Sequence, residues 1–404
     1  MEEIILKIFN LQGMTFPWKN CEVSDEEILL EFGESGQAMC PHCGTLSQNR
    51  HERGKLRKIY HGYGFGRRVY LLLRKDRYFC KRCQRSFTER VPLVLPQQRK
   101  TLEAEDQILE SLRGQSFKSL AEKEGISYGV ARRVLQRRLD PEELIWEQES
   151  EEELSLGIDA HSFRGTQLVN TVTDIRSHRP LTILPDNRKE TVKRFLRNIP
   201  EGKKQKLMEV CIDMDHMLLA AVQEKLPEAK VVVDHFHVIH DANRRVDEAR
   251  KIEQDVYKAE IPRKIFLIGK ERLSRKQQQK VESYCQKYPS LKEFYWMKEA
   301  LRSFYRLKRK KTAEKRLKDL IEIALLSDDA AMVQWGRTLK RWSPYILNYF
   351  DNRTTNAYTE GIHTKIKMVK RISFGFRNVE VYVRKVLLSL LPLTVILNLP
   401  HLSL

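Results

Sequence analysis

Two CxxC motifs in the N-terminal quarter constrain this chain more than any other feature. The first holds Cys40 and Cys43, in CPHCG, and the second holds Cys80 and Cys83, in CKRC. Two residues between cysteines let a tight turn present both thiolates to one ion, and two such turns complete a tetrahedral site. His42 lies inside the first motif, but four thiolates already suffice. Because four thiolates leave no position for water, the motifs predict a structural zinc ion.

The spacing between the motifs is unusual. They are separated by 36 residues, whereas a zinc ribbon usually has about 15–20. Hairpins that include a strand at Arg68–Leu73 would fill the gap. The alternative is that the cysteines occur by chance in a reduced protein, which is our interpretation of Cys21, Cys211 and Cys285.

The charge of the chain points to a polyanionic partner. Its 73 Lys and Arg residues exceed its 54 Asp and Glu residues, for a formal charge of +19. Such an excess is typical of proteins that bind nucleic acid or an anionic membrane surface. The longest apolar stretch, Val386–Leu399, is interrupted by Pro392 and is shorter than the roughly 20 residues of a membrane span. Without a basic leader at the N-terminus, we expect a cytoplasmic protein that does not interact with membranes.

The charges are unevenly distributed along the chain. Residues 41–100 contain 16 Lys or Arg but only 3 Asp or Glu. Residues 140–154 contain eight acidic residues and no basic one. Because like charges repel and extend a chain, we expect an acidic linker over 141–153. For the part before Glu149, the acidic end of a helix is an equally good interpretation.

The segment Ser119–Val130 fits a helix-turn-helix. Gly125 suits the left-handed turn, Ile126 and Val130 would pack inward, and Ser127 would cap the second helix. A major groove accepts such a helix, and arginine can contact guanine or phosphate there. Helical hairpins with a glycine are common, but the neighbouring basic cysteine module favours DNA binding. The arginines expected to contact DNA are Arg132, Arg133, Arg137 and Arg138.

Beyond residue 153 the pattern alternates between strands and helices. Such an alternation predicts an α/β fold, followed after Phe236 by about a hundred charged, helical residues. Another helix is expected over Asn356–Lys370. The expected strands are Leu154–Asp159, Gln167–Val172, Pro180–Leu184, Leu207–Asp213 and Lys230–Asp234, and the expected helices between them are Lys189–Asn198 and Met217–Lys225.

Three acidic residues lie at positions in this pattern that suggest a common site. Asp159 ends the first strand, Asp213 ends the fourth, and Glu360 lies on the late helix. In a ribonuclease-H-like sheet the first and fourth strands are neighbours, so the two aspartates would lie side by side. Crowded carboxylates repel unless a cation neutralises them, and oxygen ligands favour Mg²⁺ or Mn²⁺. Two such ions would support phosphodiester transfer.

Other interpretations of these residues stay open. A lone aspartate at a strand end is usually a turn former or a helix cap. Asp215 competes with Asp213, although Asp213 directly continues the apolar run Val210–Ile212. Asp234 and His237 could support the three carboxylates from behind, but His237 could equally be a packed histidine.

With these blocks in order, the chain resembles a bacterial insertion-sequence transposase of the ISL-three family. The resemblance covers nearly the whole length. It rests on CPHCG with CKRCQRSFTER, on GIDAHSFRG, on the Asp213 strand, on LPEAKVVVDHFHVIH and on TTNAYTEGIHTKIKMVKRISFGFRN. Each block is moderately specific, whereas their order and spacing together are highly specific.

The resemblance implies a multidomain α+β protein. Its parts would be a zinc-binding DNA-recognition module (1–95), a helix-turn-helix (96–140), the acidic linker, a ribonuclease-H-like DDE catalytic domain (154–238 and 346–404) and an all-helical insertion (239–345). Asp159, Asp213 and Glu360 would be the catalytic triad with Mg²⁺ or Mn²⁺. Asp234 and His237 match the family's Asp-x-x-His element.

The sequence departs from the family pattern at two positions. Ala160 follows Asp159 where family members often carry an acidic residue, and His363 stands where an asparagine is common. Neither change removes a carboxylate of the expected triad.

The resemblance also implies an activity and partners. The N-terminal modules would bind the terminal inverted repeats of a mobile element, and the DDE domain would cleave the element's end and join it to target DNA. A homodimer or larger assembly on double-stranded DNA, associated with the bacterial nucleoid, would pair the two ends. Basic residues near Glu360 would hold phosphates unless they are merely solvated; they are Lys365, Lys367, Lys370 and Arg371.

Two rival functions use parts of the same machinery. A DNA-binding regulator would need the zinc module and the helix-turn-helix but no active carboxylates. A ribonuclease-H-like nuclease or resolvase acting on structured DNA would cut without joining strands to a target.

Overall fold

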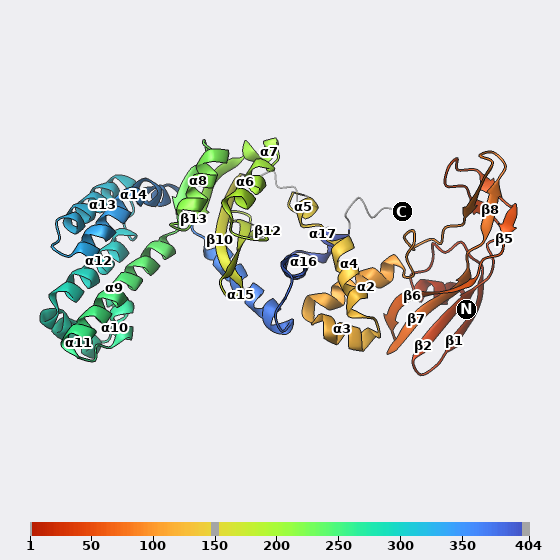
Figure 1. Ribbon diagram of the computed structural model, residues 1–404, viewed down its shortest axis with the longest axis horizontal. Coiled ribbons are helices and arrows are strands. Elements are labelled where there is room, and N and C mark those ends of the chain that lie inside the picture. Colours follow the sequence, from red (N-terminus) through yellow and green to blue (C-terminus); the bar gives the residue numbers. More distant parts are fainter. Residues whose placement is uncertain (1, 147–152, 398–404) are drawn as a thin grey trace. The chain divides into compact units, whose positions relative to one another are not determined.

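The computed structural model describes residues 2–146 and 153–397 (Figure 1). The chain divides into two compact units, one made of Met1–Gln148 with Lys365–Leu404 and the other of Glu149–Thr364. Residues 147–152 of the expected acidic linker, which spans 141–153, lie outside the described residues. Within the described ranges, no helix has the length and apolar character that crossing a membrane requires.

The first unit begins with the short helix α1 (Glu2–Ile8) and a four-stranded sheet. The strand order of the sheet is β1-β2-β7-β6. Buried and partly exposed residues alternate along β2 and β7, so that Leu30 and Leu71 form a core on one face. The strands are β1 (Trp18–Val23), β2 (Glu27–Phe32), β6 (Leu56–Gly64) and β7 (Arg67–Arg74).

Two smaller sheets carry the four cysteines of the CxxC motifs. They contain β3 (Ala38–Met39) with β4 (Leu46–Ser47), and β5 (Arg50–Glu52), β8 (Arg77–Cys80) and β9 (Arg85–Thr88). The β6–β7 hairpin leaves the cysteine module between β5 and β8 to join the larger sheet. It contains the strand expected at Arg68–Leu73 and accounts for the long spacing between the motifs.

Three helices form the expected helix-turn-helix: α2 (Leu102–Gly114), α3 (Phe117–Glu124) and α4 (Tyr128–Arg138). Gly125 adopts φ 65°, the left-handed conformation that ends α3, and the Ser127 hydroxyl accepts a hydrogen bond from the Val130 amide at 3.3 Å. Ile126 and Val130 are only half-buried; the inward-facing residues of α4 are Ala131, Val134 and Leu135.

C-terminal helices complete the core around the helix-turn-helix. After α5 (Pro141–Leu144), helix α16 (Val379–Leu390) packs against α2, α4 and α5, and α17 (Leu393–Leu397) follows it. The buried Lys385 ammonium donates to the Leu112 carbonyl oxygen, and Arg384 Nε donates to the Leu139 carbonyl oxygen at 3.1 Å. The sequence-based domain scheme grouped this helix with the carboxylate-bearing part, whereas its contacts are with the helix-turn-helix.

The second unit is built on a five-stranded sheet of order β12-β11-β10-β13-β14. Its first three strands in the chain pair antiparallel, while β10–β13 and β13–β14 pair parallel. The expected adjacency of the first and fourth strands is therefore confirmed. The strands are β10 (Leu154–Arg164), β11 (Gln167–Asp174), β12 (Arg179–Leu184), β13 (Leu207–Ile212) and β14 (Lys230–Val233), with helices α6 (Lys189–Arg197), α7 (Glu201–Lys204) and α8 (His216–Lys225) between them.

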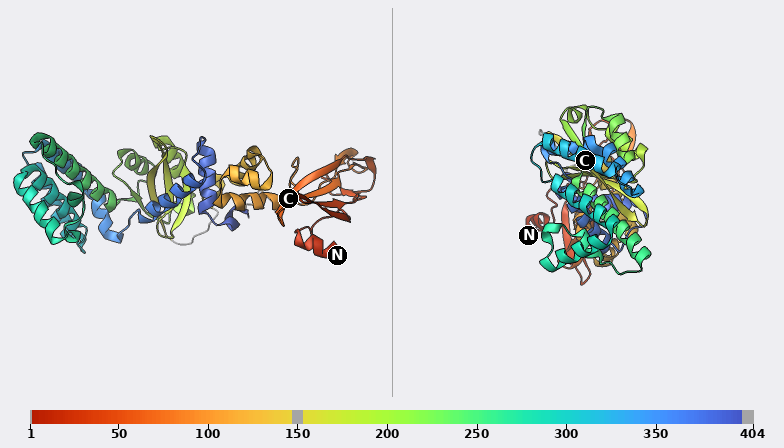
Figure 2. Two further views of the ribbon diagram at one scale, coloured as in Figure 1. Left: turned by 90° about the horizontal axis from the view of Figure 1, so that it is seen from below. Right: turned by 90° about the vertical axis from the view of Figure 1, so that its left-hand side faces the viewer.

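A helical bundle follows the sheet, coloured green to blue in Figures 1 and 2. Large aromatic side chains such as Trp335, Trp342 and Phe304 fill its core. Asn348 joins the bundle to the sheet, since its amide donates to the Val231 carbonyl oxygen of β14 at 2.8 Å. The bundle consists of α9 (His235–Tyr257), α10 (Arg263–Leu267), the 3-10 turn η1 (Lys270–Arg272), α11 (Arg275–Lys287), α12 (Pro289–Phe304), α13 (Lys310–Leu325) and α14 (Ala330–Asn352).

Helix α15 (Ala357–Ile372) begins against the middle of the sheet. The buried Asn356 amide points between two neighbouring strands, 3.4 Å from the Ile158 carbonyl oxygen of β10 and 3.4 Å from the Cys211 carbonyl oxygen of β13. The Thr359 hydroxyl hydrogen-bonds Thr173 of β11 at 2.7 Å. Gly157 makes this approach possible, because a Cβ there would lie 2.5 Å from Asn356 Oδ1.

We predict that Gly157→Ala destabilises the second unit by about 1–3 kcal/mol, because the added methyl group overpacks the contact between β10 and α15. Thermal or urea unfolding measures the change. Gly361→Ala is the control, since a Cβ at Gly361 meets nothing within 4 Å and alanine favours a helix interior. Equal stability of the two variants would contradict the prediction.

Candidate active site and zinc centre

The carboxylates singled out in the sequence gather at one edge of the five-stranded sheet. Asp159 lies on β10, two residues after Gly157 and therefore on the face that α15 covers. Asp213 directly follows β13, the neighbour of β10. Glu360 lies in the first turn of α15, held there by the contacts of Asn356 and Thr359. Elements that are far apart in the sequence, β10, β13 and α15, thus bring the three groups to one place.

Asp234 and His237 belong to the same site and stand closest to Glu360. Asp234 follows β14 and caps helix α9, and its side chain is 1% exposed. One ligand atom from each of Asp234, His237 and Glu360 lies within 4.8 Å of the others. His237 Nε2 is also 3.8 Å from Asp159 Oδ1, close enough for attraction between charges but too far for a hydrogen bond.

The site concentrates negative charge in a buried place. Burial raises the pKa of Asp159 to about 6; the charges of Asp213, Glu360 and Asp234 add to the rise and His237 opposes it. Burial also raises the pKa of Asp213 and, assisted by Asp234, that of Glu360. Mutual repulsion of this kind destabilises the fold, and clustered carboxylates with raised pKa values are typical of functional sites.

A divalent cation fits these donors. In the carboxylate site, buried atoms of four residues have no hydrogen-bond partner: Asp213 Oδ1, Asp234 Oδ2, Glu360 Oε1 and His237 Nε2. Buried polar atoms in folded proteins nearly always have partners, so this group of exceptions calls for an explanation. Mostly oxygen donors with one imidazole suit Mg²⁺ or, better, Mn²⁺.

Asp215, the competitor of Asp213 in the sequence, has a structural role. Its carboxylate accepts hydrogen bonds from the Met217 amide at 2.6 Å and the Leu218 amide at 3.3 Å. It is therefore the N-cap of α8. Asp213 Oδ1 has no such partner.

A chain of polar side chains that sequence reasoning missed leads to Asp159. His161 Nδ1 and His363 Nε2 lie 2.9 and 3.0 Å from the Thr171 hydroxyl, and His363 Nδ1 is 3.6 Å from Asp159 Oδ2. Thr171 is the residue of β11 directly opposite Asp159. Only the strand register reveals this pairing, so the sequence carries no signal for it, although it does flag His363 as unusual.

The four cysteines form a separate cluster in the first unit. One sulfur atom from each lies within 4.8 Å of the others, and Cys43 Sγ is 3.6 Å from Cys80 Sγ. Gly44, at φ 69°, forms the first turn, in which the Gly44 amide donates to the Cys40 carbonyl oxygen at 2.9 Å. Cys40 and Cys80 are buried, as expected of a closed structural site.

Three family models match successive parts of the chain. The model of the DDE transposase domain of the ISL3 family, described as "Transposase", matches residues 156–386, more than half of the chain. The chain belongs to the ISL3 transposase family. The helix-turn-helix domain of this family matches residues 89–139, and the zinc finger of the transposases of IS204, IS1001, IS1096 and IS1165 matches residues 37–83.

Curated relatives carry the same name. This ISL3 transposase is 25% identical to the transposase for insertion sequence element IS1001 of Bordetella parapertussis, over 86% of this chain and 87% of that protein. It is 24% identical to the transposase for insertion sequence element IS1557 of Mycobacterium tuberculosis, over 58% of this chain and 60% of that protein. The zinc-finger match and the cluster of four cysteines together support a structural zinc site. The helix-turn-helix implies DNA binding.

The four arginines expected to contact DNA differ in their surroundings. Arg138 is 2% exposed and lies 2.5 Å from Asp106 Oδ1, while Arg137 hydrogen-bonds the buried Glu105. Both side chains therefore hold α4 against α2. Arg133 is exposed and Arg132 is half-buried. These two remain the arginines of α4 that DNA could reach.

For the zinc site, we expect about one zinc ion per chain by elemental analysis. Cys40→Ser combined with Cys83→Ser removes two of the four ligands and should leave none. Cys21→Ser is the control, since Cys21 lies on β1 outside the cluster. Zinc retained by the double variant would contradict the assignment of the four ligands.

Proposed function

We propose that this ISL3 transposase binds the terminal inverted repeats of an insertion sequence and performs metal-dependent cleavage and strand transfer of DNA. The observation that carries the proposal is the convergence of Asp159, Asp213 and Glu360, together with Asp234 and His237, at one edge of the sheet. The strand order, with three antiparallel strands followed by two parallel ones, supports a ribonuclease-H-like catalytic domain.

In this proposal Asp159, Asp213 and Glu360 hold Mg²⁺ or Mn²⁺. When bound, such ions activate the attacking water or 3′-hydroxyl and stabilise the leaving oxygen. Asp234 adds a fourth carboxylate beside Glu360, and His237 offsets part of the negative charge at Asp159. The anchoring of α15 through Asn356 keeps Glu360 at a fixed position relative to the two aspartates.

DNA would be held by basic groups in both parts of the chain. In this proposal Arg132 and Arg133 of α4 contact the major groove. Further along α15, Lys365, Lys367 and Arg371 are exposed, and Lys370 is half-buried. Because they lie on the helix that carries Glu360, we propose that they contact phosphates close to the cleaved bond.

A comparison of two neighbouring aspartates tests the active site. We predict that Asp213→Asn lowers cleavage of end-containing DNA in the presence of Mg²⁺ or Mn²⁺ at least about 100-fold, a loss typical of an essential charged group. Asp215→Asn removes the same charge two residues away but keeps the cap of α8, because asparagine also caps helices. It should retain cleavage within a few-fold.

Gel analysis of labelled DNA ends, with and without a chelator, measures both variants. The proposed enzyme activity is wrong if the wild type does not cut in any divalent metal. The assignment to Asp213 is wrong if Asp213→Asn cuts like the wild type or if Asp215→Asn loses as much activity.

We also propose that two or more chains assemble on the element's ends, because both ends must be brought together. Light scattering coupled to size-exclusion chromatography should give at least twice the 47.7 kDa chain mass in the presence of end DNA. A complex of one chain per DNA molecule at all concentrations would contradict this proposal.

A further inference from the structure

A groove of about 650 Å³ lies in the first unit, between the cysteine module and the four-stranded sheet. Seven cationic side chains line it. Arg53 and Lys58 form ion pairs with Glu34 and Glu27, and the remaining five are Lys55, Arg57, Lys75, Arg77 and Arg99. They come from separate parts of the chain, namely the start of β6, the connection from β7 to β8, the start of β8 and the segment before α2. None of the five forms an ion pair with a carboxylate of the described residues.

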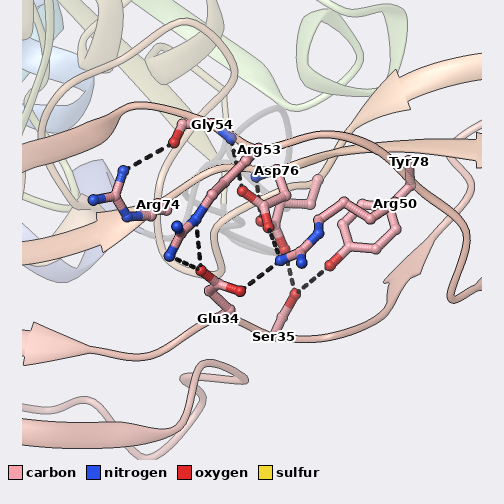
Figure 3. Close-up of polar contacts among 9 residues, drawn as sticks. Glu34, Ser35, Arg50, Arg53, Gly54, Arg74, Asp76 and Tyr78 are labelled. Carbon is pink, nitrogen blue, oxygen red and sulfur yellow. Dashed lines mark hydrogen bonds and ion pairs between the residues drawn. The ribbon is translucent and has the colours of Figure 1, made fainter.

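Glu52 is exposed and lines the groove, whereas the other acidic residues nearby are engaged elsewhere. Asp76 is buried, and Asp76 Oδ1 accepts a hydrogen bond from the Gly54 amide at 2.8 Å. The buried Glu89 accepts hydrogen bonds from the Asp76 amide and the Ser35 hydroxyl, each at 2.5 Å. Glu34 is occupied with two arginines outside the set of five, as Figure 3 shows: Arg50 at 2.5 Å and Arg53 at 2.9 Å. These three carboxylates therefore stabilise the frame. Glu52 is the one acidic residue among the groove's lining residues, against seven cationic ones, so the groove is strongly positive.

Two backbone segments that line the groove, one at Gly54 and one at Lys75, cross in close contact. A Cβ at Gly54 would lie 1.9 Å from the Lys75 carbonyl oxygen, so the two backbone segments touch directly. The Arg74 guanidinium donates to the Gly54 carbonyl oxygen at 3.2 Å, which holds the crossing from the other side (Figure 3). Burial lowers the pKa of Lys75, and the charge of Arg57 lowers it further. A bound anion would relieve this repulsion.

We propose that this groove binds the sugar-phosphate backbone of double-stranded DNA. A row of cations without acidic partners matches the closely spaced phosphates of a duplex. Strand β6 links the groove to the helix-turn-helix within one unit, since its first residues line the groove and the Tyr60 hydroxyl donates to Glu124 of α3 at 3.1 Å. The inference deepens the proposed binding of transposon ends and rests on it for the identity of the DNA.

The groove and the recognition helix should then contribute differently to binding. Contacts to phosphates add affinity without reading sequence, whereas contacts to base edges discriminate between sequences. The groove is accordingly a sequence-independent clamp that acts together with α4. Loss of its charges should weaken binding to all duplexes in the same proportion.

The test measures binding of the full-length protein to two fluorescent duplexes of equal length, one with an element end and one scrambled, over a range of NaCl concentrations. The variant carries Lys55→Gln, Arg57→Gln and Arg99→Gln, three exposed groove cations. Its control carries Arg275→Gln, Lys276→Gln and Lys280→Gln on α11, which removes the same charge from exposed positions of the helical bundle. Zinc content and thermal unfolding verify that both variants fold.

We expect the groove variant to bind both duplexes at least about tenfold more weakly at low salt, with an unchanged ratio between them. Each lost phosphate contact lowers the slope of log affinity against log salt by about 0.9, so three contacts lower it by about 2.7. A wild-type slope, or an equal change in the control, would overturn the proposal. If the triple variant does not fold, Arg57→Gln alone should lower the slope by about 0.9, and Arg57→Lys should leave it unchanged.

This outcome is independent of the proposed catalytic function. The slope is measured on uncut DNA without divalent metal, so the measured salt dependence is valid even if the wild type does not cleave DNA. A wild type that does not distinguish the element end from the scrambled duplex would count against end recognition, while the salt dependence would still decide whether the groove binds DNA.

Discussion

The contact between Asn356 and the carbonyl oxygens of Ile158 and Cys211 holds α15 on the five-stranded sheet, and the arrangement of the carboxylate site depends on it. Those oxygens belong to two neighbouring strands: Asp159 lies on β10, and Asp213 directly follows β13. A single side-chain amide thus fixes the start of α15 relative to both strands, and Glu360 follows one turn later. The contact requires a bare backbone at Gly157. The Asn356 contact holds Glu360 near the two aspartates against the repulsion between the buried carboxylates.

Much of this arrangement could be predicted from the sequence. Periodicity and turn residues located the strands of the second unit, and the expected positions of Asp159, Asp213 and Glu360 suggested one site. The prediction that the first strand ends at Asp159 was wrong, because β10 pairs with β11 as far as Arg164. Two CxxC motifs sufficed to predict the zinc module, because ligand spacing is a local property. The sequence favoured Asp213 over Asp215 because Asp213 directly continues the strand, and in the structure Asp215 is a helix cap.

The features that escaped prediction depend on contacts between distant residues. Four arginines on α4 look alike in the sequence, yet Arg138 is buried against Asp106 while Arg133 is exposed. Helix α16 reads as an ordinary apolar helix, and nothing in it reveals that it packs against the helix-turn-helix. The link from His363 through Thr171 to His161 depends on the register between β10 and β11. A single sequence contains periodicity, but it does not contain these pairings.

In the basic segment of the first unit, two of the three acidic side chains are buried while most of the cations lie at the surface. This separation explains how so basic a segment can fold. Residues 41–100 carry 16 cations and 3 acids, and two of those acids, Asp76 and Glu89, are buried. Buried carboxylates that accept backbone and hydroxyl hydrogen bonds stabilise a particular crossing of the chain. Had they stood at the surface, they would have neutralised neighbouring cations instead. The fold thus buries two of the three acids of this segment, and the surface charge that they leave unneutralised would attract a polyanion.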